Sequence, residues 1–160
     1  MRMSEGVEWA VHSCLILAWV EDRGPVPTAR LASRYDLPAP YLNKQLQALG
    51  RAGIVTSIPG PKGGFRLARR PERITMMDIV AAIEGPDEAF RCTEIRQRGS
   101  AGDITMRALR RPCSVASAMR TAELAWRRAL AAQTLADVMT ETERQLPEAG
   151  DRVRRWFDRS

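Results

Sequence analysis

The sequence predicts a mainly α-helical fold with one small β-hairpin, on three observations. Apolar residues recur at the spacing of amphipathic helices over most of the chain. Two short β-type runs flank a turn rich in Gly and Pro at 59–64. Basic side chains concentrate in one stretch: residues 28–70 hold eight Lys and Arg, and Asp36 is the one acidic residue among them. The net positive charge of this stretch exceeds the net charge of +6 of the whole 160-residue chain. This length suits one ordinary domain with an added helical arm.

The first predicted helix runs from about Ser4 to Trp19, with Ser4 as its N-cap. Its core stripe consists of apolar residues at helical spacing, namely Val7, Val11, Leu15 and Ala18. Glu8 and His12 stand four residues apart, so both side chains project from one face and could bind one object.

A helix-turn-helix is predicted next. The second helix starts at Pro27 and Thr28 and continues to Tyr35, where residues 36–38 break it. Pro40 suits the first turn of the following helix. That helix turns an apolar face inward through Leu42, Leu46 and Leu49. Its opposite face is polar and basic and can contact base edges and phosphates.

Two β-type runs at 54–58 and 65–67 predict a hairpin, since glycines in the turn supply the positive φ angles that tight turns need. Helix, turn, helix and Gly-rich wing in this order, with this charge, indicate a winged helix-turn-helix that binds double-stranded DNA. The alternative is a surface hairpin beside a solvated charged helix. The expected DNA-binding residues are Thr28, Arg30, Arg34, Tyr41, Lys44, Gln47, Ala48, Arg51, Lys62, Gly63 and Arg66.

A fourth helix completes the predicted DNA-binding domain, which spans residues 1–85. Thr75 caps this helix, and Asp78 three residues later is its capping-box partner. Gly85 and Pro86 end it. Its core-facing residues are Met76, Ile79, Val80 and Ile83.

Residues 86–111 lack clear periodicity and form a loop of unusual length for a compact domain. Cys92 lies near its start and Cys113 just past its end, so we expect this loop to bind a ligand. No pair of cysteines has CxxC spacing, and the three cysteines are an odd number, which argues against a disulfide scaffold. From spacing alone, buried small hydrophobic cysteines are the alternative.

Residues 112–146 form a predicted dimerisation helix region. Pro112 opens a long helix whose apolar stripe exceeds what the small winged domain needs, so we expect it to pack against a second copy. The stripe consists of Val115, Ala118, Met119, Ala122, Trp126, Ala129 and Leu130. A homodimer would present two recognition helices to a pseudo-palindromic operator. Thr134 and Asp137 form a second capping box.

The tail over 147–160 is charged, with Trp156 and Phe157 as apolar anchors, and its pattern assigns it no role. No run of eighteen apolar residues and no cleavable signal pattern occur, so we expect a cytoplasmic protein without membrane association.

The chain resembles the Rrf2 family of bacterial winged-helix repressors. The resemblance covers all but the tail, from the helix of residues 7–10 through Tyr41-Leu42 and the glycines at 60, 63 and 64 to the long helix after Cys113. Within it, residues 6–12, 85–90 and 92–99 are similar to a redox regulator of that family.

The resemblance implies a [2Fe-2S] cluster at the dimer interface. Its ligands would be Cys92 and Cys113 of one subunit and Glu8 and His12 of the other. The family's loop usually holds three cysteines, and the loss of one here favours a mixed set with oxygen and nitrogen ligands. Trp9 is either a gate that shields the cluster or a core tryptophan. Cys14 is expected in the core.

The expected function is therefore a dimeric DNA-binding transcriptional regulator, acting as a repressor, that senses redox state through the cluster. One alternative keeps the DNA binding but makes the switch a thiol oxidation at Cys92 and Cys113, or a small ligand. Another is a zinc enzyme with Glu8 as general base. Because the sequence holds no catalytic metal motif, we expect no enzyme activity.

Overall fold

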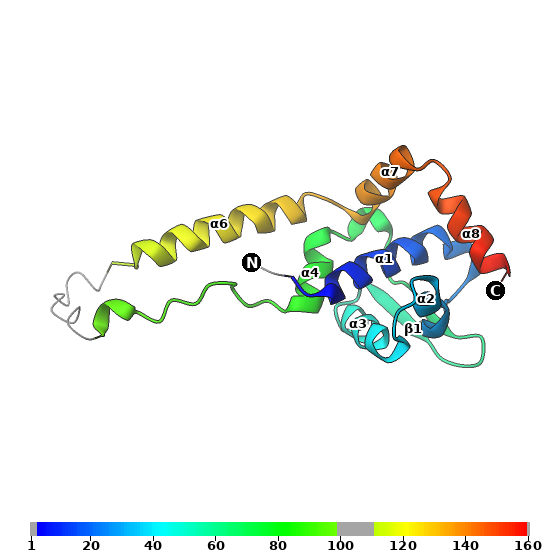
Figure 1. Cartoon of the computed structure of the whole chain (residues 1–160), viewed down its shortest axis with the longest axis horizontal. Helices are drawn as coiled ribbons and strands as arrows, with labels where there is room; N and C mark the ends of the chain where they lie inside the picture. The colour runs from blue at the N-terminus through cyan, green and yellow to red at the C-terminus, as the bar shows by residue number, and fades with distance from the viewer. Residues whose placement is uncertain (1–2, 99–110, 160) are drawn as a thin grey trace. The chain divides into compact units, whose positions relative to one another are not determined.

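The computed structural model describes residues 3–98 and 111–159. Contacts divide them into two compact units, one of residues 3–86 with 130–159 and one of residues 87–129. Figure 1 shows the order of the elements along the chain. They are α1 (Glu5–Trp19), η1 (Glu21–Arg23), α2 (Thr28–Arg34), α3 (Ala39–Arg51), β1 (Val55–Ile58), β2 (Gly64–Leu67), η2 (Pro71–Arg73), α4 (Met76–Glu84), η3 (Ile95–Gln97), α6 (Ser114–Ala131), α7 (Leu135–Gln145) and α8 (Ala149–Arg159). The prediction of a mainly helical chain with a small wing is confirmed.

The helix-turn-helix consists of α2 and α3. Pro40 lies in the first turn of α3, where its missing N–H costs no helical hydrogen bond. Leu42, Leu46 and Leu49 are fully buried, so the apolar face predicted for this helix is the one that enters the core.

The wing is the antiparallel hairpin of β1 and β2, in which Val55 pairs with Leu67 and Ile58 with Gly64. Val26 extends this sheet, because it exchanges two backbone hydrogen bonds of 2.9 and 2.8 Å with Phe65. A Cβ at Gly64 would lie 2.3 Å from the Val26 carbonyl oxygen, so only glycine permits the two backbones to approach this closely.

Helix α1 is the centre of the winged-helix unit, since it contacts α3, α4, α7, α8 and β2. Of its predicted stripe, Val7 and Leu15 are buried, whereas Val11 and Ala18 are only partly buried. The buried face is wider than one stripe because several elements cover the helix. Cys14 lies in this core, as expected, and its burial raises the pKa of its thiol to about 12.

Two predicted capping boxes are confirmed. The Thr75 hydroxyl accepts from the Asp78 N–H and the Asp78 carboxylate accepts from the Thr75 N–H, each at 3.0 Å. Thr134 and Asp137 make the same exchange at 3.1 and 2.8 Å at the start of α7. Helix α4 ends at Gly85, whose φ of +89° is a conformation that favours glycine.

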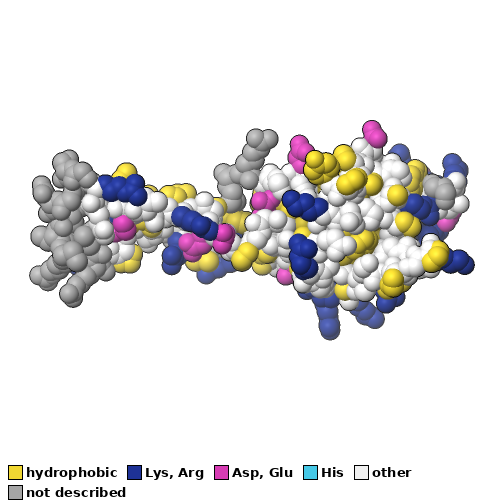
Figure 2. Space-filling view, turned by 90° about the horizontal axis from the view of Figure 1, so that it is seen from below, with side chains coloured by type: hydrophobic (Ala, Val, Ile, Leu, Met, Phe, Trp, Pro, Cys, Tyr) yellow, Lys and Arg dark blue, Asp and Glu magenta, His cyan; other side chains and the backbone are white. Residues whose placement is uncertain are grey.

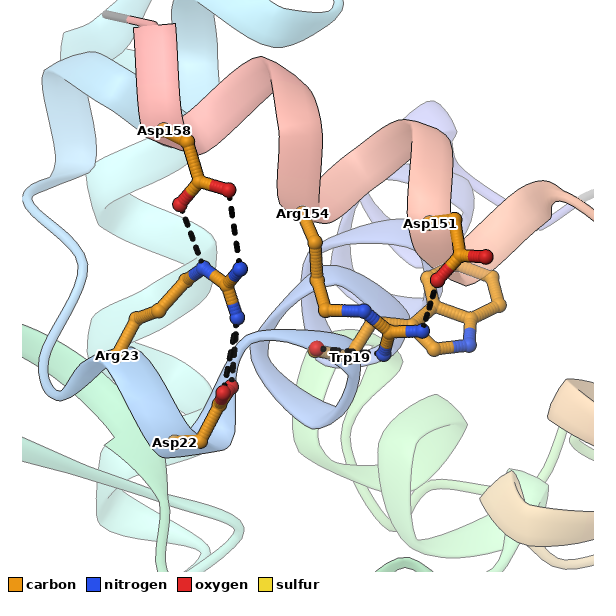
Figure 3. A network of polar contacts seen from close by, with 6 residues as sticks. All are labelled: Trp19, Asp22, Arg23, Asp151, Arg154 and Asp158. Carbon is orange, nitrogen blue, oxygen red and sulfur yellow. Dashed lines mark hydrogen bonds and ion pairs between the residues drawn. The ribbon is translucent and has the colours of Figure 1, made fainter.

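The charged tail forms helix α8, which packs on the winged-helix unit. Gly150 lies against Trp19, where a Cβ would come within 2.9 Å of the indole. Figure 3 shows the polar contacts between this helix and the residues around Trp19 and Arg23. The Arg23 guanidinium donates two hydrogen bonds of 2.9 and 3.0 Å to Asp158, and Arg154 donates to the Trp19 carbonyl at 3.3 Å. Phe157 is buried among these elements.

In the second unit, α6 is preceded by Pro112, as predicted. Three large apolar side chains of α6 are exposed in the single chain, Val115 by 58%, Met119 by 44% and Leu124 by 45%. Glu123 is buried instead, and its carboxylate accepts from the Ala89 N–H at 3.0 Å and from Arg127 at 2.9 Å. Across the described ranges, the structure contains no helix with the length and apolarity needed to cross a bilayer.

Candidate DNA-binding surface and cysteine centre

The outer face of α3 carries the side chains predicted to contact DNA bases. Tyr41 is 65% exposed, and Lys44, Gln47 and Arg51 are exposed as well, whereas Ala48 is partly buried. Lys and Arg side chains recur across the face of the winged-helix unit seen in Figure 2, and Asp and Glu lie mainly toward its margins. A helix with polar side chains on a basic face is the arrangement that enters a major groove.

The wing adds two exposed cations, Lys62 and Arg66. Gly63 between them is buried, and a Cβ there would lie 2.1 Å from the Ile58 carbonyl oxygen. Its N–H donates to the Gly60 carbonyl at 2.9 Å. Gly63 therefore shapes the turn that holds Lys62, and its own contact with DNA stays a prediction.

Thr28, at the start of α2, is partly buried and donates a 3.4 Å hydrogen bond to the Asn43 side chain. Asn43 is exposed on α3 next to Lys44. An asparagine amide pairs with adenine in the major groove, so Asn43 joins the candidate base-contacting set. Asn43 was not among the residues predicted from the sequence, although its place near Lys44 and Gln47 was a usable signal.

Arg30 and Arg34 of α2 lie against α8. The Arg30 guanidinium donates to the Phe157 carbonyl at 2.6 Å and lies 4.8 Å from the Phe157 ring centroid. Arg34 lies 5.7 Å from the Trp156 ring. Both arginines are partly buried and connect the helix-turn-helix to the tail. Their predicted role in binding DNA stays a prediction.

The structure brings Cys92 and Cys113 together in the unit of residues 87–129. Their Sγ atoms and a carboxylate oxygen of Glu94 all lie within 4.8 Å of one another. The Cys92 thiol donates a 3.3 Å hydrogen bond to Glu94 Oε1. Both cysteines are free thiols, Cys92 exposed and Cys113 partly buried.

The surroundings of the two thiols differ in charge and polarity. Cys113 immediately precedes α6, and the N–H groups of Ala116 and Val115 at that helix start hold the pKa of its thiol below the ordinary value. At Cys92 the Glu94 N–H favours the thiolate, but the Glu94 carboxylate, desolvation and Cys113 outweigh it and raise the pKa. Cys113 is thus the readier thiolate of the pair.

Glu94 is the residue of this centre that was not predicted from the sequence. It adopts a left-handed conformation with φ of 48°, uncommon for a residue other than glycine. Arg96 donates to Glu94 Oε2 at 2.6 Å and to the Arg111 carbonyl at 3.4 Å, so it links the segment of Cys92 to that of Cys113. The Cys-x-Glu spacing was the available signal.

Glu8 and His12 belong to the other unit, where both are exposed on α1. The His12 ring contacts Tyr35 edge to face, with 5.4 Å between centroids. Glu8 lines a groove of about 910 Å³ between α1, α3 and α4, together with Trp9, Tyr41 and Lys44. That Glu8 and His12 bind the same cluster as the two cysteines stays a prediction.

The helix-turn-helix, the wing and the basic face define a winged-helix DNA-binding protein. The family described as Rrf2, iron-dependent transcriptional regulator, matches residues 3–141, and the chain belongs to this family. It is accordingly a transcriptional regulator and not an enzyme.

Several transcriptional regulators are similar to this chain, each over a different share of its length. The HTH-type regulator YffB of Lactococcus lactis is 32% identical over 89% of this chain and 90% of its own length. The regulator slr0846 of Synechocystis is 39% identical over 56% of this chain and 61% of its own length. IscR of Aliivibrio salmonicida is 32% identical over 58% of this chain and 55% of its own length. The chain thus spans little more than half the length of two of these three relatives.

Two solved structures are similar over most of the chain. T. potens IscR has a TM-score of 0.66 and 25% identity, over 91% of each chain. CymR, the global cysteine regulator of B. subtilis, has a TM-score of 0.65 and 26% identity, over 88% of this chain and 98% of its own. Both support the winged-helix architecture.

Proposed function

We propose that this chain is a dimeric transcriptional repressor that senses redox state through a [2Fe-2S] cluster bound at Cys92 and Cys113. The observation that carries the proposal is the convergence of these two thiols within 4.8 Å, from segments twenty-one residues apart. The family description as iron-dependent and the similarity to proteins named IscR support it. Segments 6–12, 85–90 and 92–99 also resemble the redox regulator RsrR.

The residues present fit such a group. Thiolates are the usual ligands of iron-sulfur clusters, and imidazole replaces them in some [2Fe-2S] centres. The start of α6 lowers the pKa of the Cys113 thiol, and Cys92 is exposed and accessible. Glu8 and His12 are exposed four residues apart on α1, so a second subunit could supply both ligands from one helix face. A bound [2Fe-2S] cluster would supply one-electron redox chemistry.

The exposed apolar face of α6 is the proposed dimer surface. Val115 and Met119, one turn apart on the predicted stripe, stay exposed in the single chain, although each would be stabilised by burial. Packing two such helices together would bury these side chains and pair two recognition helices for a pseudo-palindromic operator.

Glu8 provides the proposed connection to DNA. It stands on α1, which packs on α3, and it lines the same groove as Tyr41 and Lys44 of the recognition helix. Binding or release of the cluster by Glu8 would therefore shift α1, the helix on which α3 packs. Such a shift would couple the state of the cluster to the affinity of α3 for the operator. Trp9 lines the groove beside Glu8 and is the proposed gate.

Anaerobic purification tests the proposal. We expect a coloured protein with two irons and two acid-labile sulfides per cluster, whose operator affinity changes with redox state or on cluster loss. Glu8→Ala and His12→Ala should each alter the visible spectrum, whereas Glu5→Ala, on the same helix, should not. A spectrum identical in the wild type and in both ligand variants would remove Glu8 and His12 from the ligand set.

A thiol switch is the second candidate, favoured by the same short distance between Cys92 and Cys113. Oxidation would join the two sulfurs in a disulfide and transfer two electrons to an oxidant such as a peroxide, with release of the two thiol protons. This switch predicts a colourless protein whose DNA binding changes on peroxide treatment and recovers with a dithiol reductant. Cys92→Ser would abolish that response. A colourless protein whose DNA binding ignores peroxide would exclude this candidate.

A further inference from the structure

We infer that Cys92, Glu94 and Cys113 of a single chain form a binding site for one divalent cation of the zinc class. This site shares its two thiols with the proposed function but uses Glu94 in place of Glu8 and His12. The same cysteines would thus have a second occupant when no cluster is bound.

The distances are close to those of a tetrahedral site. With Zn–S bonds of about 2.3 Å, two sulfur ligands stand about 3.8 Å apart, and a sulfur and a carboxylate oxygen about 3.5 Å. Here all three donor atoms lie within 4.8 Å, and Cys92 Sγ already lies 3.3 Å from Glu94 Oε1. Closing the site thus requires side-chain movements of about an ångström.

The donor types match the same class of metal. Thiolates favour zinc over the hard cations calcium and magnesium, which prefer all-oxygen ligands. Three protein ligands leave a fourth position for water, the pattern of an exchangeable or catalytic zinc site rather than a closed structural one. A cation held in this way can be displaced when a cluster is assembled.

Arg96 is the positioning residue of this site. Its guanidinium holds Glu94 Oε2 at 2.6 Å, which leaves Oε1 directed at the Cys92 thiol. Its second hydrogen bond, to the Arg111 carbonyl, holds the segment that leads into Cys113. Two thiolates and a carboxylate carry three negative charges, and a divalent cation with Arg96 balances them.

All three donors belong to the unit of residues 87–129, so the site is complete within one chain. Loss of Glu8 and His12, or of the dimer, should therefore leave it intact. The [2Fe-2S] centre of the proposed function needs those residues instead, and this difference separates the two assignments.

Cobalt titration of the full-length, metal-free protein under a phosphine reductant tests the inference. We expect one Co²⁺ per chain with thiolate-to-cobalt charge-transfer absorption, displaced by Zn²⁺. Glu94→Gln should weaken Co²⁺ binding at least tenfold, because even the loss of a residue that only orients a ligand costs tenfold or more in metal affinity. The matched control is Glu88→Gln, an exposed carboxylate of the same unit paired only loosely with Arg120 at 3.7 Å, and it should bind like the wild type.

The Glu8→Ala, His12→Ala double variant completes the test. Cobalt bound as tightly by this variant as by the wild type supports a site within one chain. Cobalt binding that is lost in the double variant, or unchanged in Glu94→Gln, would overturn the inference while leaving the cluster untouched. Intact cobalt binding in a protein that never acquires iron and sulfide would overturn the proposed cluster alone.

Discussion

Lys62→Ala measures how much of the DNA affinity comes from the wing. Four exposed cations, Lys44, Arg51, Lys62 and Arg66, lie on α3 and the wing, so the proposed dimer would carry eight. If each neutralises one phosphate, the logarithm of the binding constant should fall with the logarithm of salt concentration with a slope of about −7. Lys62→Ala removes two of the eight and should bring this slope to about −5.

The assay is fluorescence anisotropy on a duplex that the protein selects from a random pool, and on an unrelated duplex, between 50 and 200 mM salt. Lys62→Ala should weaken both alike, because a phosphate contact carries no sequence information. Lys44→Ala should cost about 1–3 kcal/mol more on the selected duplex than on the unrelated one.

Arg152→Ala is the matched control, an exposed arginine on α8 outside these elements, and should leave the slope unchanged. An unchanged slope in Lys62→Ala would refute the role of the wing. Equal loss on both duplexes in Lys44→Ala would remove that residue from the base-contacting set.

Two further predictions concern the tail and the thiols. Phe157→Ala should lower the free energy of unfolding by about 3–5 kcal/mol in urea denaturation, because it leaves a cavity at a buried position and removes the ring that Arg30 contacts. The control Asp151→Asn, at an exposed ion pair, should lower it by under about 1 kcal/mol. Equal losses in the two variants would show that α8 is not anchored by its aromatic ring. The start of α6 holds the pKa of Cys113 below its ordinary value, while the pKa of Cys92 is raised. Cys113 should therefore be alkylated faster than Cys92 at pH 7, and this difference in rate should shrink as the pH rises above both pKa values. Iodoacetamide rates in Cys92→Ser and Cys113→Ser check this, and equal rates at pH 7 would contradict it.

Local signals in the sequence predicted the winged-helix part well. The spacing of Leu42, Leu46 and Leu49 alone determines which face of α3 is buried, and all three are fully buried. The capping boxes at Thr75 and Thr134 lie within four consecutive residues, so no tertiary information is needed to place them. Elements specified by neighbours in the sequence were therefore predictable.

Features that depend on partners distant in the sequence could not be predicted from it. The contacts of Arg30 and Arg34 with α8 could not be read from neighbouring residues, because α8 begins more than a hundred residues later. Their contact with DNA stays a prediction. The sequence indicated Trp156 and Phe157 as apolar anchors of the tail, but not where α8 packs, because its partners Trp19 and Arg23 lie on other elements. The Cys-x-Glu spacing offered a weak signal for Glu94, and the fold gave it weight by bringing Cys113 beside Cys92.

Close packing between α1 and α3 gives the proposed coupling a physical basis. A Cβ at Gly6 would lie 2.9 Å from the terminal amide of the Gln45 side chain, so the two helices are in contact at this point. Gly6 stands two residues from Glu8, and Gln45 is next to Lys44. Because tightly packed interfaces change by discrete shifts rather than by gradual compression, a displacement of Glu8 should move α3 with α1. The proposed ligand and the proposed base-contacting residue are thereby joined across a single helix contact.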